Sequence, residues 1–182
     1  MKKLIALAVA ACAAVAVNAA TVQWSATNIA FSEAQADASK YTAYLIDNGI
    51  GGYADAAAAF AALQADGADA DGVIHTKSGL TANAAGTAMS LAITNDTLGN
   101  DPGYSAGDKI TAWTIIVDNT SAATAQNYLF SEKTNAGVNN SLKLAVAAGT
   151  QASNTWVAAP EPTSGLLLLL GVAGLALRRR RA

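Results

Sequence analysis

Short apolar segments separated by polar and turn-forming residues fill the middle of the chain, between residues 20 and 159. This pattern favours β-strands. The most apolar segment is 109–117, and its apolar side chains fall on both faces of a strand: Ile110, Ala112 and Ile116 on one face, and Trp113, Ile115 and Val117 on the other. A strand of this kind belongs at the centre of a sheet that is covered on both sides. We therefore expect residues 109–117 to form a central, buried strand.

Shorter or more polar segments predict further strands before and after this one. They span residues 21–31 (one or two strands), 41–46, 73–76, 87–94, 127–130, 141–146 and 155–157. In segment 141–146, leucine or valine at every second position predicts a strand with one buried and one exposed face. Turn signals separate the segments, notably Asp47-Asn48-Gly49 and Asn100-Asp101-Pro102-Gly103.

One segment, residues 53–65, has the spacing of a helix instead. Apolar residues recur at positions 56, 59, 60 and 63, which lie on one helical face. Asp55 stands near the start and Gly67 just after the end, where helices favour such residues. Because this face is narrow and mostly alanine, we expect the helix to lie flat on a sheet edge or opening. Many strands with one inserted helix predict a mainly β fold, a β-sandwich of the jelly-roll or Greek-key kind.

The segment 1–19 has the features of a secretory signal peptide. Lys2 and Lys3 form a basic start, and residues 4–17 form an apolar run that predicts a signal helix. Residues 17–19, Val-Asn-Ala, fit the small-residue pattern that signal peptidase recognises. We therefore expect passage through the secretion translocon and cleavage between Ala19 and Ala20.

Cys12 leaves one alternative open. Residues 9–12, Val-Ala-Ala-Cys, resemble a lipobox, in which the cysteine would be lipidated and become the new N-terminus. Residues 13–17 continue the apolar run where a lipoprotein usually turns polar, which favours the ordinary signal peptide. Cys12 is the single cysteine of the chain, so the mature protein then contains none.

The last part of the chain combines three features in order. They are the tripeptide Pro160, Glu161 and Pro162, an apolar run at residues 165–177, and the terminal basic cluster Arg178, Arg179, Arg180 and Arg181. As a helix the apolar run would measure about 20 Å, which is marginal for a single membrane helix because the hydrocarbon core is roughly 30 Å thick. The arginines should stay in the cytoplasm, which places the tripeptide on the outer side. The two prolines favour an extended, accessible segment around Glu161.

This combination resembles the PEP-CTERM sorting signal of Gram-negative bacteria. The resemblance covers residues 160–181 and implies recognition and processing by exosortase, an integral-membrane enzyme. The same type of tail is also catalogued as the C-terminal domain of ice-binding proteins, a name that describes some passengers and not the signal. Residues 43–47 and 113–120 resemble segments of short PEP-CTERM passengers of Verrucomicrobia and Lentisphaerae type, a group without an assigned activity.

These signals predict three parts and an exported protein. The parts are a signal peptide at 1–19, a β-rich passenger domain at 20–158 and a sorting tail at 159–182. The C-terminal helix then serves as a transient anchor in the inner membrane. After processing, the passenger reaches the cell surface or the extracellular space.

The charge of the passenger excludes one class of partner. Residues 20–159 carry five lysines, no arginine and twelve acidic residues, a net charge of −7 against −2 for the whole chain. Binding to nucleic acid depends on neutralising phosphates with basic side chains. An acidic domain without arginine therefore predicts no nucleic-acid partner.

A cluster of acidic residues follows the predicted helix. Asp66, Asp69 and Asp71 could supply oxygen ligands to Ca²⁺, an ion that suits extracellular sites. The spacing departs from an EF-hand, because aligning Gly72 with the invariant glycine puts Gly67 and Ser78 where acidic ligands belong. The alternative is a solvated acidic loop after the helix.

Candidate catalytic residues are scarce. His75 is the single histidine, and no Gly-x-Ser-x-Gly motif is present to supply a nucleophile. No cysteine or second histidine is available in the passenger to complete a metal site with His75. We therefore predict no catalytic residue and no cofactor.

Trp24, Trp113 and Trp156 suggest a different activity, the stacking of aromatic rings on sugars. Trp113 falls in the segment that is predicted to be buried, so a core role is the alternative for it. Three classes of function follow: a non-enzymatic surface or extracellular-matrix protein, which is favoured, a secreted carbohydrate-binding module, and an enzyme, which the missing motifs disfavour. Extracellular polysaccharide is an expected partner of the first class. Ice binding would require a regular array of Thr-x-Thr repeats, which the sequence lacks.

Overall fold

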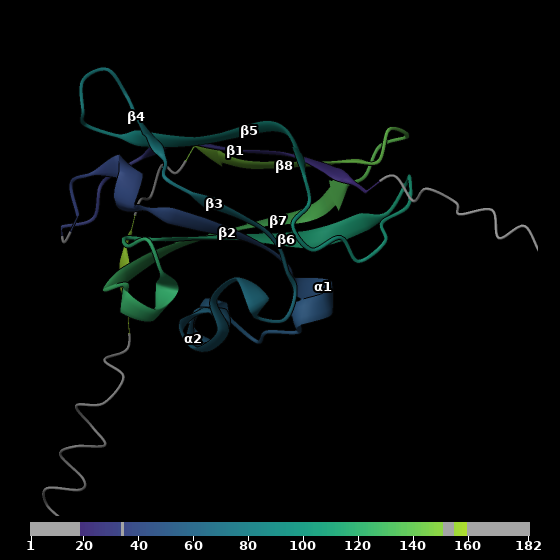
Figure 1. Ribbon diagram of the computed structural model, residues 1–182, viewed down its shortest axis with the longest axis horizontal. Coiled ribbons are helices and arrows are strands. Elements are labelled where there is room, and N and C mark those ends of the chain that lie inside the picture. Colours follow the sequence, from purple (N-terminus) through teal and green to yellow (C-terminus); the bar gives the residue numbers. More distant parts are fainter. Residues whose placement is uncertain (1–18, 34, 151–154, 160–182) are drawn as a thin grey trace, which may run out of the picture.

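The structure is a computed structural model that describes residues 19–33, 35–150 and 155–159 (Figure 1). Within these residues the chain forms two sheets, with strand orders β4-β5-β1-β8 and β3-β2-β6-β7-β9. The strands are β1 (Thr21–Ile29), β2 (Thr42–Asp47), β3 (Val73–Ser78), β4 (Thr81–Ala82), β5 (Met89–Thr97), β6 (Lys109–Val117), β7 (Asn127–Gly137), β8 (Lys143–Thr150) and β9 (Val157–Ala158). The helices are α1 (Asn48–Gly51) and α2 (Ala56–Asp66), with 3-10 turns η1 (Ala38–Lys40), η2 (Gly67–Asp69) and η3 (Ala122–Thr124).

The two sheets pack face to face, which confirms the predicted sandwich. The chain crosses between the sheets after β1, β3, β5, β7 and β8. Neighbouring strands are antiparallel except β1 and β8, which run parallel. In Figure 1 the start of β1 and helix α1 lie at one end of the long axis, and β9 lies at the other end.

The main core lies between the sheets and follows the two-residue period of the strands. On β1, Val22, Trp24 and Ala26 point inward and are buried. They meet the inward face of β6, and the indole Nε1 of Trp24 donates a hydrogen bond to Thr114 Oγ1 at 3.0 Å. This bond joins β1 of one sheet to β6 of the other, so Trp24 links the two sheets directly.

A bulge changes the alternation near the end of β1. The pairing with β5 shifts between Ala26 and Ile29, and Asn28 has a positive φ of 54°. Asparagine tolerates this left-handed backbone better than most residues. The extra residue turns Ile29 into the core, where it is fully buried.

A second core lies on the outer face of the five-stranded sheet, beneath α2. Phe60 of α2 stacks on Tyr128 of β7, with ring centroids 4.4 Å apart. Trp113, Ile115 and Val117 of β6 are buried in the same cluster. Strand β6 therefore lies at the centre of its sheet with both faces covered, as predicted. The prediction that the helix lies on a sheet edge or opening was wrong, because α2 covers the face of the sheet.

The helix begins three residues later than predicted. Asp55 caps it, accepting a hydrogen bond from the backbone N of Ala58 at 2.8 Å. Tyr53 is held outside the helix because its backbone N donates to Asn48 Oδ1 at 2.9 Å. Gly67 ends α2 with a positive φ of 61°, which confirms the predicted stop.

Most of the predicted strands are present with shifted ends. The segment 109–117 matches β6 at both ends, and β8 has the predicted buried side chains Leu144 and Val146. Strand β7 is longer than predicted, and β9 has two residues. Strand β4 was not predicted, because its two residues are exposed and carry no alternating pattern.

Several predictions fall outside the described residues. They concern the signal helix with its lipobox alternative at Cys12, the tripeptide Pro160, Glu161 and Pro162, the apolar run 165–177, and Arg178, Arg179, Arg180 and Arg181. In the part of the chain that the structure describes, no helix has the length and apolar character needed to cross a membrane.

Candidate functional site

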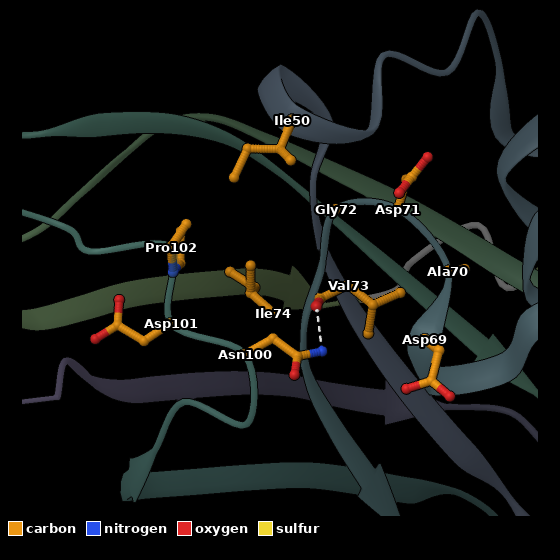
Figure 2. A pocket seen from close by; sticks show the side chains of 10 residues that line it. All are labelled: Ile50, Asp69, Ala70, Asp71, Gly72, Val73, Ile74, Asn100, Asp101 and Pro102. Carbon is orange, nitrogen blue, oxygen red and sulfur yellow. Dashed lines mark hydrogen bonds between the residues drawn. The ribbon is translucent and has the colours of Figure 1, made fainter.

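A hollow of about 410 Å³ lies at the end of the sandwich where β1 begins (Figure 2). We call it the acidic hollow, because Asp69, Asp71 and Asp101 are among the residues that line it. The other lining residues are Ile50, Ala70, Gly72, Val73, Ile74, Asn100 and Pro102. They come from three places in the fold: α1, the start of β3 with the loop before it, and the loop that follows β5.

Asn100 and Gly72 fix two parts of the wall of the acidic hollow. Figure 2 shows the amide of Asn100 reaching β3, where its Nδ2 donates to the carbonyl of Val73 at 2.9 Å. Gly72 forms the opposite part of the wall with a positive φ of 76°. A Cβ atom at this position would lie 2.7 Å from the carbonyl oxygen of Asp47, so the tight approach requires glycine.

The structure does not bring the three candidate calcium ligands together. Asp66 is the last residue of α2 and does not line the acidic hollow. Figure 2 shows the carboxylates of Asp69 and Asp71 pointing in different directions. Among the described residues, no group of three aspartate, glutamate, histidine or cysteine side chains is placed to hold a metal ion. The geometry favours a solvated acidic loop at this position.

Asp101 is the most constrained carboxylate of the acidic hollow. Its Oδ2 accepts a hydrogen bond from the backbone N of Ala20 at 2.6 Å. Its Oδ1 accepts from the backbone N of Gly103 at 2.9 Å and of Tyr104 at 3.3 Å. Partial burial opposes ionisation, but these three N–H donors together hold the pKa of Asp101 below its usual value. Asp101 is therefore a fixed negative charge at neutral pH.

Tyr104 connects this loop to the start of α1. Its hydroxyl donates to Oδ2 of the buried Asp47 at 2.7 Å, and Asp47 Oδ1 accepts from the backbone N of Gly49. Burial, together with the carboxylates of Asp47, Asp101 and Asp108, strongly raises the pKa of Tyr104. The phenol therefore stays protonated and acts as a donor.

A second buried carboxylate, Asp118, lies at the opposite end of the sheet. It accepts hydrogen bonds from the hydroxyl of Ser32, from the backbone N of Gln126 and from both the backbone and side-chain nitrogens of Asn127. Ser32 comes from the loop after β1, Gln126 from the far end of the loop that Asp118 begins, and Asn127 from the start of β7. The sequence therefore offered no signal for this cluster beyond a turn after β6. It fixes the loop that receives β9.

His75 lies on β3, mostly buried beside Trp24, with the two rings edge to face at 6.2 Å. Its Nε2 is 3.8 Å from Oδ2 of Asp96, a carboxylate that is 61% exposed. Burial lowers the pKa of His75 more than the attraction of Asp96 raises it, so the imidazole is neutral at neutral pH and the contact is a weak one. Its Nδ1 has no hydrogen-bond partner among the described residues.

The three tryptophans do not form a common platform. Trp24 is fully buried between the sheets, and Trp113 is buried beneath α2, where its ring meets Phe130 edge to face. Trp156 is half-buried against Tyr41, with ring centroids 5.5 Å apart. The three rings therefore form no shared sugar-stacking surface, because two of them are used in the cores, and the alternative of a core role for Trp113 is confirmed.

Trp156 instead lines a second hollow, of about 820 Å³, next to β9. We call it the tail-side hollow. Its lining residues are Phe31, Glu33, Gln126, Asn127, Thr155, Trp156 and Ala158. Nε1 of Trp156 donates to the carbonyl of Ala30 at 3.1 Å, which fixes the orientation of the ring.

The described chain ends in a strand that is attached to the five-stranded sheet. Val157 and Ala158 of β9 pair with Tyr128 and Asn127 of β7. The backbone N of Ala159 then donates to the carbonyl of Gln126 at 2.7 Å. The passenger is thus held by hydrogen bonds up to the residue before Pro160.

One comparison with known proteins identifies a feature of the chain. Residues 158–181 match the family model of the PEP-CTERM protein-sorting motif. The match includes the tripeptide, the apolar run and the arginine cluster, and it begins inside β9. No curated protein and no solved structure matches this chain. The chain therefore carries a PEP-CTERM sorting motif, which implies an exported protein that an exosortase sorts at the membrane.

Proposed function

We propose that this chain is a non-enzymatic protein of the cell surface or extracellular matrix. It is exported through its N-terminal signal peptide, held briefly in the inner membrane by its C-terminal helix and released by exosortase. The observation that carries this proposal is the sorting motif at residues 158–181. The acidic passenger is the part that is exported, and we expect it to associate with extracellular polysaccharide.

The geometry of the passenger supports a structural role over catalysis. The titratable groups with the most partners, Asp101 and Asp118, are saturated by hydrogen bonds from the protein itself. His75 is mostly buried and neutral, and its Nδ1 has no hydrogen-bond partner among the described residues. Groups used in this way stabilise loops and leave no free acid–base pair for a substrate.

Cell fractionation tests the proposed route. An epitope inserted after Ala85, in the exposed loop between β4 and β5, marks the passenger without touching either core. In a bacterium that encodes an exosortase we expect the epitope at the surface or in the medium, on a chain shortened at its C-terminus. In the matched strain lacking the exosortase gene we expect the longer chain in the inner membrane. Equal release from both strains would contradict the sorting route.

A second candidate function, carbohydrate binding, is favoured by the tail-side hollow. Trp156 and Phe31 provide aromatic surface there, beside the polar side chains of Glu33 and Gln126. Sugar-binding sites combine these two chemistries, since apolar sugar faces pack on aromatic rings while hydroxyls bond to carboxylates and amides.

A glycan array probed with the exported protein separates the two functions. If the tail-side hollow binds sugars, Trp156→Ala should weaken binding about tenfold, because an aromatic contact is worth up to about 1.5 kcal/mol. Val157→Ala is the matched control, since Val157 is the next residue of the same segment, is exposed and does not line the hollow. Binding to no glycan on the array would remove this second candidate.

A further inference from the structure

The backbone nitrogen of Ala20 occupies an unusual position. Ala20 is fully buried although Ala19, the residue before it, is exposed. Its nitrogen lies 2.6 Å from Oδ2 of Asp101, and its carbonyl accepts a hydrogen bond from the backbone N of Leu98 at 3.0 Å. The residue that follows the predicted cleavage site is therefore held on both sides, with a carboxylate aimed at its nitrogen.

We propose that Asp101 is the receptor for the new N-terminus that signal peptidase creates at Ala20. Cleavage hydrolyses the bond between the carbonyl carbon of Ala19 and the nitrogen of Ala20. The hydroxyl of the attacking water goes to the Ala19 carbon and a proton goes to the Ala20 nitrogen. After ionisation the departing peptide ends in a carboxylate and Ala20 begins with an ammonium group.

This step strengthens a contact that already exists. Before cleavage, Ala20 offers Asp101 a single neutral amide N–H. After cleavage it offers an ammonium group at the same place, and hydrogen bonds between charged partners are roughly twice as strong as neutral ones. Asp101 is ready for this partner, because Gly103 and Tyr104 hold its other oxygen in position.

The surrounding charges favour the ammonium form. Asp108 lies on the same loop as Tyr104, Asp47 at the end of β2 accepts the hydrogen bond of the Tyr104 hydroxyl, and Tyr104 itself is neutral. Lys143 of β8 is half-exposed and pairs in register with Thr21, the residue after Ala20. Asp101 is the carboxylate that contacts the Ala20 nitrogen.

The consequence for stability has a definite sign. A carboxylate partner raises the pKa of an α-amino group above its ordinary value of about 7.7–8.0, whereas burial lowers it. We expect the 2.6 Å contact with Asp101 to outweigh the burial of Ala20, so that the pKa of the new N-terminus is raised. The stabilisation is then complete below pH 7.7 or so and is lost as pH rises through the raised pKa of the folded state. If the α-amino group lies away from Asp101, the stability of the domain should not fall in this way as pH rises.

Processing is thereby coupled to the acidic hollow. Asp101 lines that hollow, and its loop connects through Tyr104 to Asp47 and the start of α1. An ammonium group at Ala20 fixes the start of β1 and this loop against each other. Cleavage of the signal peptide, on this proposal, completes one end of the domain.

The experiment uses the full chain, exported in a host that has signal peptidase but lacks exosortase, and purified in detergent. Mass spectrometry gives the N-terminus, which we expect at Ala20. The key variant has one extra alanine inserted between Ala19 and Ala20, so residues 17–19 still direct cleavage and the mature chain begins one residue earlier. In this variant the backbone N–H of Ala20 can still donate its hydrogen bond to Asp101. The charged α-amino group, however, lies one residue earlier. Asp101→Asn is the second variant.

Urea unfolding, followed by tryptophan fluorescence from pH 7 to pH 10, is the measurement. At pH 7 we expect the unfolding equilibrium constant of the insertion variant to be about tenfold larger than that of the parent, which corresponds to a pKa raised by about one unit. The difference should vanish towards pH 10. Asp101→Asn should remove the same pH dependence from the parent.

Two results would overturn the proposal: an N-terminus other than Ala20, or an insertion variant with the stability and pH profile of the parent. The proposal rests on export through the signal peptide, which is part of the proposed function. Since the host lacks exosortase, either negative result leaves the sorting route untouched. Failure of Asp101→Asn to fold does not affect the comparison, because the insertion variant retains Asp101.

Discussion

Replacing Pro160, Glu161 and Pro162 with alanine is expected to stop processing of the exported chain and to leave it in the inner membrane. The tripeptide lies within the matched motif, and its chemistry explains why it is needed. Proline fixes its own backbone and restricts the residue before it, so the sequence predicts an extended, accessible segment around Glu161. Alanine favours helix instead and would allow the apolar helix to continue towards the passenger.

The position of β9 makes this effect large. The hydrogen bonds of the passenger extend to Ala159, and Pro160, the next residue, has no backbone N–H to continue the ladder. The recognition sequence thus follows the folded domain without a linker. No residue separates Ala159 from Pro160. A change of backbone conformation at residues 160–162 therefore acts directly on the junction with the folded domain.

Immunoblotting of fractionated cells measures the result, with the epitope after Ala85. We expect the longer chain in the inner-membrane fraction and nearly none at the surface. The control carries three alanines at exposed positions of β7, Glu132, Lys133 and Thr134, and should mature like the parent. Normal maturation of the tripeptide variant would contradict the assigned role of these residues.

Trp24→Ala is expected to destabilise the passenger by about 3–5 kcal/mol, the usual cost of removing a buried tryptophan. Trp24 is fully buried between the sheets, and its loss also leaves Thr114 Oγ1, itself buried, without its bond to the indole. Domains of this size are typically stable by about 5–15 kcal/mol, so the variant should be close to unfolding.

Urea unfolding of the exported chain at neutral pH measures the change in free energy. Trp24→Phe separates the two contributions, because it keeps aromatic volume and removes the hydrogen bond to β6. Gln23→Ala is the matched control on the same strand, where the side chain faces solvent and substitutions cost within about 0.5 kcal/mol. A loss below about 1 kcal/mol for Trp24→Ala would mean that the link between the sheets is not needed.

Local patterns predicted the elements that depend on their own sequence. The apolar residues on both faces of 109–117 were enough to place β6 at the centre of a sheet, and Asp55 and Gly67 marked the ends of α2 closely. The position of α2 was not predictable in this way. An alanine-rich face fits an edge or a broad surface equally well, and the buried contacts with distant residues, among them the stacking of Phe60 on Tyr128, select the surface.

The candidate sites were harder to predict because their partners are distant in sequence. Asp101 meets Ala20, and Asp118 meets Ser32, across separations of 81 and 86 residues. Such pairs exist only after both sheets have formed. The aspartates at 66, 69 and 71 gave a clear local pattern, but the fold directs them apart. The sorting tail was predictable because its features are contiguous in sequence.

The predicted signal cleavage site before Ala20 and the sorting motif after β9 lie at opposite ends of the passenger. Ala20 and the acidic hollow lie at one end of the long axis, and β9, which leads into the sorting motif, lies at the other (Figure 1). On the proposed route, the end of the passenger with β9 would face the membrane that the tail enters, and the end where β1 begins would face away from it. Cleavage by signal peptidase would then complete the outward end before exosortase releases the protein.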